Sequence, residues 1–111
     1  MFVFRESPDM SQLSPADMEQ IFRRWMAWVD ELRAKGLYLG GEPLEPQPAS
    51  VLRGATSVTV TDGPYAEAKE IVGGFILIRA ASLAEAVAIA RGCPGLPDGG
   101  SVEVRQVMPM P

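Results

Sequence analysis

The chain of 111 residues contains no histidine. Histidine is the commonest general base near neutral pH and the commonest zinc ligand, so its absence excludes Ser-His and Cys-His pairs and histidine metal sites. Any acid–base chemistry would depend on carboxylates, lysine, tyrosine or cysteine. We therefore expect no metal and no other cofactor.

Cysteine and clustered positive charge are scarce as well. Cys93 is the single cysteine, which excludes an intrachain disulfide and fits a reducing compartment. The net charge is −4 and lysine and arginine form no cluster, which argues against nucleic acid or an anionic membrane surface as a partner. Charged residues interrupt the N-terminus and the apolar stretch 71–93, so we expect neither a secretory signal nor a membrane span. The sequence predicts a cytoplasmic protein.

What is present is typical of one globular domain over residues 1–111, because 47% of the residues are apolar and 22% are charged. Alternating apolar residues predict strands at 1–6, 37–39, 74–79 and 101–108. A hairpin is predicted from strands 50–53 and 57–61 with a connection at 54–56. The glycine pair at 40–41 is expected to bend or end its strand, followed by a proline-rich loop over 42–48.

The first predicted helix opens with Ser14 as N-cap, Pro15 as first residue and Asp17 near a capping box, and it ends at Gly36. Its apolar stripe consists of Met18, Ile21, Phe22, Trp25, Trp28, Val29 and Leu32. This spacing places both tryptophans in the core rather than in a binding site.

The second predicted helix is capped by Ser82 with Glu85 completing a capping box, and it ends at Gly92. Its packing stripe is Leu83, Ala86, Val87 and Ala90. Cys93 would follow at the C-terminus, where the negative end of the helix dipole raises a thiol pKa. We interpret this cysteine as inert.

Without the hairpin, the order of elements is β-α-β-β-α-β, which predicts an α+β fold of the ferredoxin-like type with an inserted hairpin. Two helices cover one face of such a sheet. The other face would carry apolar residues together with Arg5, Glu103 and Arg105, and a second copy packed against it would form a dimeric α+β barrel. We therefore expect a homodimer.

Arg5 and Arg105 should lie close together, because the first and last strands are neighbours in this topology. Two arginines that share Glu103 leave positive charge spare, which suggests a small anionic ligand such as a carboxylate. In the alternative interpretation the arginines are fully paired, by Glu103 and by acids from residues 62–70 or the partner subunit, and have a structural role. We slightly favour the structural role.

Residues 62–70, Asp-Gly-Pro-Tyr-Ala-Glu-Ala-Lys-Glu, stand directly before the most apolar run of the chain. An aspartate before Gly-Pro favours a turn, and the proline suits the first turn of a helix. One interpretation is therefore a capped turn with a solvated charged face, which we favour because functional sites are few. The other is the lip of a pocket, with side chains that face a ligand: Asp62, Tyr65, Glu67, Lys69.

This stretch carries a resemblance to a known family. Together with Gly40-Gly41-Glu42, Gly74-Phe75, Glu85-Ala86 and residues 101–105, it resembles the YCII-related family, in the branch named for its Asp-Gly-Pro-Phe motif. The resemblance covers nearly the whole chain, including the Trp28–Leu32 helix segment and Gly36, and implies a dimeric α+β barrel. The chain departs from the motif at Tyr65 (usually Phe), Ala68 (usually Thr) and Gln106 (usually Pro).

Two functions are compatible with these observations. The first is a lyase or isomerase acting on a small anionic molecule, with Asp62 or Glu67 as the base and Lys69 or Arg105 stabilising negative charge. A family branch that resembles lyases uses a His–Asp pair, which this chain lacks. The second is a non-catalytic or accessory module that binds a small ligand through Arg5, Asp62, Tyr65, Lys69 and Arg105. The absence of histidine favours the second.

Overall fold

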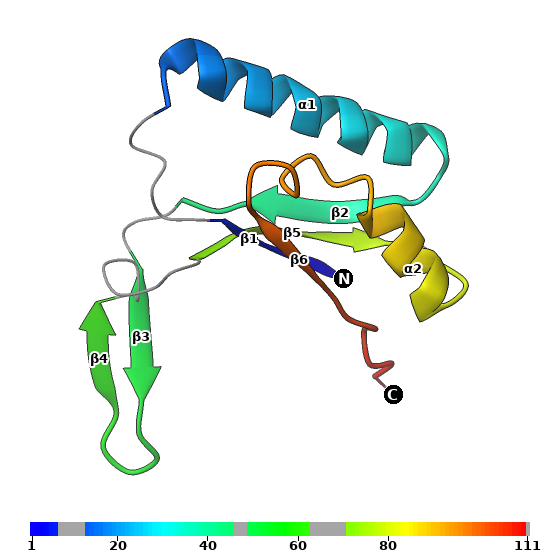
Figure 1. The fold of residues 1–111 in the computed structure, drawn as a ribbon. Coiled ribbons are helices and arrows are strands. Elements are labelled where there is room, and N and C mark those ends of the chain that lie inside the picture. The colour runs from blue at the N-terminus through cyan, green and yellow to red at the C-terminus, as the bar shows by residue number, and fades with distance from the viewer. Residues whose placement is uncertain (7–12, 46–48, 63–70, 111) are drawn as a thin grey trace.

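The computed structural model describes residues 1–6, 13–45, 49–62 and 71–110, and of residues 61 and 62 it describes the backbone alone. Figure 1 shows two helices over an antiparallel sheet, with a separate hairpin that projects away from it. The elements are β1 (Phe2–Glu6), α1 (Pro15–Ala34), β2 (Tyr38–Pro43), β3 (Ser50–Arg53), β4 (Thr59–Asp62), β5 (Ile71–Ile78), α2 (Leu83–Ala90) and β6 (Ser101–Val104).

The four-stranded sheet has the order β2-β5-β1-β6, and all its neighbouring strands are antiparallel. With the hairpin set aside, this is the strand order of the ferredoxin-like fold, so the predicted α+β architecture with an inserted hairpin is confirmed. The first and last strands are neighbours, as predicted. β5 begins earlier than predicted, at Ile71, and β6 ends earlier than predicted, at Val104.

Both helices begin at the predicted caps. The Ser14 hydroxyl accepts from the Asp17 amide at 3.1 Å, and the Asp17 carboxylate accepts from the Ser14 amide at 3.2 Å, which completes a capping box. In α2 the Ser82 hydroxyl accepts from the Glu85 amide at 3.1 Å. The Glu85 carboxylate, however, accepts from Ala81 at 3.0 Å, one residue before the cap, so the predicted reciprocal box is not formed there.

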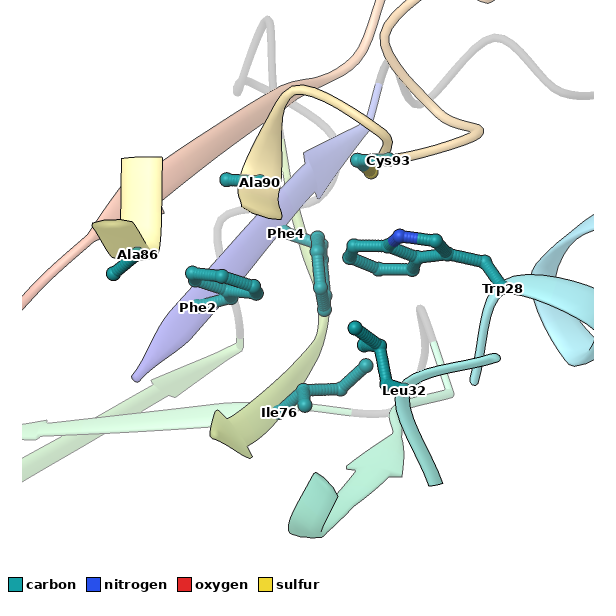
Figure 2. Packing of buried hydrophobic residues seen from close by; sticks show 8 residues of the cluster. All are labelled: Phe2, Phe4, Trp28, Leu32, Ile76, Ala86, Ala90 and Cys93. Carbon is teal, nitrogen blue, oxygen red and sulfur yellow. The ribbon is translucent and has the colours of Figure 1, made fainter. Parts of the chain in front are cut away.

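The core forms between the sheet and the two helices. Figure 2 shows Phe2 and Phe4 of β1 and Ile76 of β5 facing Trp28 and Leu32 of α1. The α2 side adds two alanines and the cysteine after it: Ala86, Ala90, Cys93. Phe2 is fully buried, and its ring stacks on Trp28 with centroids 6.2 Å apart. Trp28 is buried and Trp25 packs against the cluster, so the interpretation of the tryptophans as core residues is confirmed.

The predicted apolar stripes are only partly buried. Met18 and Phe22 in the first turns of α1 are exposed, as is Leu83 in α2. The eight residues of α2 lie toward the other end of α1 (Figure 1), so no described element covers the N-terminal turns of α1. Periodicity identified the correct face of α1 but not how much of its length is covered.

β2 differs from the prediction, because it continues through Gly40 and Gly41 as far as Pro43. Its register against β5 shifts between Tyr38 and Gly40, where Gly40 adopts a φ of +149°. A Cβ at Gly41 would collide with the carbonyl oxygen of Phe75 on β5. The glycines therefore permit a bulge and a close approach between strands rather than ending the strand.

The hairpin also differs in detail. Arg53 lies opposite Thr59, so the connection covers residues 54–58 and is longer than predicted. The backbone of Asp62 pairs with Ser50, which makes Asp62 the last residue of β4 instead of part of a turn. The predicted turn and helix over 63–70 lie outside the described residues.

Candidate functional site

The sheet face opposite the helices is open in the single chain. Val3, Phe75 and Leu77 alternate with core residues, so they point away from the helices, and all three are half-buried. Ile76 is buried against the helices, whereas the opposite face of β5 remains partly accessible. We call Val3, Phe75 and Leu77, together with Arg5 and Glu103, the open face.

At one side of the open face two arginines share one glutamate. Nη1 of Arg5 on β1 lies 3.1 Å from Oε1 of Glu103 on β6, and Nη1 of Arg105 lies 3.5 Å from Oε2 of the same carboxylate. The backbone of Arg105 is held in place by Met1, because its amide donates to the Met1 carbonyl at 2.9 Å. We call these three side chains the Arg5–Glu103–Arg105 cluster. The predicted proximity of the two arginines is present.

The charges of this cluster do not cancel. Two guanidinium groups face one carboxylate, and Arg105 keeps 69% of its side chain exposed. Water reaches all three groups, so the ion pairs stabilise the fold weakly. A guanidinium offers donors in a planar fork that matches a carboxylate in two-point contact. The exposed fork of Arg105 is therefore available to an anion.

The other predicted site residues are not assembled with the cluster by the described chain. Asp62 ends β4, in a sheet separate from the one that carries the two arginines, and its side chain is not described. Tyr65, Glu67 and Lys69 lie outside the described residues. The capped turn and the pocket lip at residues 62–70 both stay predictions.

A cavity on the helix side of the sheet was not predicted. It has a volume of about 260 Å³ and lies at the end of β1, between α1 and the loop that follows α2. Its walls include Phe4, Trp25 and Cys93, and Glu6 lines it as well. Burial raises the pKa of the Glu6 carboxyl above its ordinary value. A sequence signal existed, because Glu6 continues the alternation of Phe2 and Phe4, a position at which burial is expected.

Cys93 forms part of that wall and is buried. Burial raises the pKa of its thiol, and backbone N–H groups of Gly95 and Leu96 partly offset the effect. Desolvation is thus the first cause, where the sequence had suggested the helix dipole. A raised thiol pKa leaves little thiolate near neutral pH, so Cys93 is a poor nucleophile.

The described ranges contain no helix long and apolar enough to cross a bilayer, and no group of three or more acidic, cysteine or histidine side chains placed to hold a metal.

Comparison with known proteins adds two findings. The family model of the YCII-related domain matches residues 1–111. An uncharacterised protein of Rhizobium meliloti (strain 1021), R00369, is 47% identical over 58 residues, which are 51% of this chain and 47% of that protein. The chain therefore spans about half the length of this curated relative.

Proposed function

Because the chain belongs to the YCII-related family over residues 1–111, we propose that it acts as a homodimer that binds a small anionic molecule. The single observation that carries the proposal is the surplus positive charge of the Arg5–Glu103–Arg105 cluster on a face that one copy leaves open.

The proposed dimer follows from the open face. Val3, Phe75 and Leu77 present apolar surface that stays half-exposed in one chain, and a second copy packed sheet to sheet would remove it from water. Such packing forms a dimeric α+β barrel, as the resemblance to the Asp-Gly-Pro-Phe branch also implies. β5 is central in the sheet and β6 is an edge strand, so the apolar residues meet in the middle and the cluster stays near the rim.

The proposed ligand follows from the charges at that rim. An anion placed between the two chains would meet the guanidinium groups of Arg5 and Arg105 with Glu103 already paired. A carboxylate suits this position because it accepts two parallel N–H donors from one arginine. Binding of the carboxylate requires that the acidic side chains of residues 62–70 do not occupy the same position.

We prefer a binding function for this protein over a catalytic one. Glu103 is the carboxylate of the cluster, and two arginines already engage it, so it is a poor candidate for a general base. A lyase or isomerase would need Asp62 or Glu67 to reach the bound anion as the base. The lone cysteine supports a reducing compartment, and we propose the cytoplasm as the location.

Arg105→Met tests the proposal in a thermal-shift screen with acetate, succinate and benzoate. Wild type should be stabilised by at least one of these, and the variant should stay a folded dimer that no longer responds. Arg23→Met is the matched control, because Arg23 lies on exposed α1 surface and pairs only locally with Glu19 at 2.7 Å. A wild type unaffected by every carboxylate would end the proposal, and an Arg105 variant that unfolds easily or loses the dimer would assign the residue a structural role.

A further inference from the structure

The cavity at the end of β1 lies on the helix side of the sheet, and of the open-face residues Arg5 alone also contributes to its lining. Its walls are mainly apolar and aromatic, with Phe4 from β1, Ile21 and Trp25 from α1, and Cys93 after α2. The Trp25 ring packs edge-on against Phe4 with centroids 4.9 Å apart, so both rings are fixed in position. The result is a small, mainly apolar space with a few charged residues in its lining.

Three charged residues contribute to its lining, and two of them are neutralised. The Arg5 guanidinium is engaged with Glu103 at 3.1 Å, and the Asp98 carboxylate pairs with Arg24 at 3.2 Å. The Glu6 carboxylate has no hydrogen-bond or ion-pair partner among the residues the structure describes. It packs beside Gly73, where a Cβ would come within 2.9 Å of Glu6 Cδ. Within this described lining, Glu6 is therefore the one uncompensated charge.

An unpaired carboxylate in a partly apolar space costs free energy that a counter-ion would offset. The desolvation that raises the pKa of Glu6 reports the same cost. The neighbouring indole of Trp25 presents an electron-rich π-system, which attracts cations more strongly than the rings of phenylalanine or tyrosine. Charge and ring together favour an organic cation over a neutral or anionic molecule.

We propose that this cavity binds a small primary ammonium compound, with Glu6 as its counter-ion and Trp25 as its aromatic wall. The volume of about 260 Å³ limits the ligand to a short alkyl chain or a single ring. The site differs from the proposed anion site in the sign of its charge and lies on the helix side of the sheet, and Arg5 contributes to both.

Benzylammonium chloride is a suitable probe, titrated into the full chain with Trp25 fluorescence and calorimetry as readouts. Trp28 does not line the cavity, so Trp25→Phe should abolish the fluorescence response while leaving heat of binding. Benzyl alcohol has nearly the same shape without the charge, and benzoate carries the opposite charge. Benzylammonium should bind saturably, with benzyl alcohol about tenfold weaker or worse.

Glu6→Gln keeps the shape of the side chain and removes its charge, so it should weaken benzylammonium binding about tenfold or more. Glu19→Gln is the matched control, because Glu19 lies on exposed α1 surface, pairs with Arg23 at 2.7 Å and does not line the cavity, and it should bind the probe as wild type does. Equal binding of benzyl alcohol and benzylammonium to wild type would overturn the proposal without any variant. The proposal would also be overturned if benzylammonium showed no saturable binding to wild type, or if Glu6→Gln bound it as tightly as wild type does.

Discussion

Arg5 on β1 and Glu103 on β6 form an ion pair of 3.1 Å across neighbouring strands, 98 positions apart in the sequence. The pair lies on the face without helices, and its carboxylate also serves Arg105. Glu103 thus occupies the guanidinium groups that the proposed anion would contact, and the two compete for the same donors.

Glu103→Gln should therefore raise the affinity for the carboxylate that stabilises the wild type. The loss of stability should be small, up to about 1 kcal/mol, because all three side chains are reached by water. Calorimetric titration gives the affinity and chemical denaturation the stability. Weaker carboxylate binding by Glu103→Gln would contradict competition and indicate that Glu103 positions the arginines for the ligand.

A charge placed in the centre of the open face should separate the proposed dimer. Phe75→Asp puts a carboxylate on central strand β5, where a second sheet would have to bury it unpaired. Light scattering should report a dimer for wild type at micromolar concentration and a helical monomer for the variant. Phe22→Asp is the control, since Phe22 is 63% exposed on α1, and it should stay dimeric. A monomeric wild type would remove the barrel.

The core should respond to truncation at Phe2. Phe2→Ala removes a fully buried ring that stacks on Trp28, so unfolding free energy should fall by about 3–5 kcal/mol. Phe22→Ala removes the same atoms from an exposed position and should change it by less than about 0.5 kcal/mol. Urea denaturation measures both. Similar losses in the two variants would mean that α1 packs with a different face.

The sequence predicts the parts of the fold that depend on short-range signals. Ser14 with Asp17 and Ser82 marked the helix starts, because caps act over three residues. The Arg5–Glu103 contact was also predictable, since strand alternation and the ferredoxin-like order together place both residues on one face of adjacent strands.

Features that depend on distant packing were not predictable. Gly41 is locally a strand breaker, and only its close approach to Phe75 explains why β2 runs through it. The cavity beside Glu6 arises from the way Trp25 and the loop after α2 pack over the end of β1. No pattern within a single element contains that arrangement.

The difference in stability between Glu6→Gln and the wild type should depend on pH. The folded state raises the pKa of Glu6 by burial, so near neutral pH it must hold an ionised carboxylate that the unfolded chain solvates better. As the pH falls, the folded state binds a proton at a higher pH than the unfolded chain does. The stability of the wild type therefore increases as the pH falls past the folded-state pKa of Glu6. Below the unfolded pKa both states are protonated and the gain is complete.

Glu6→Gln should consequently melt higher than wild type at neutral pH, and this advantage should shrink on acidification and vanish below the ordinary glutamate pKa of about 4.3. The charged groups that share the cavity, Arg5 and Asp98, are paired elsewhere and are unchanged in both proteins. Glu19→Gln, on exposed helix surface, controls for general loss of charge. A Gln variant less stable than wild type at neutral pH would show that Glu6 has a favourable partner in the folded protein, which would also remove the basis for an ammonium ligand.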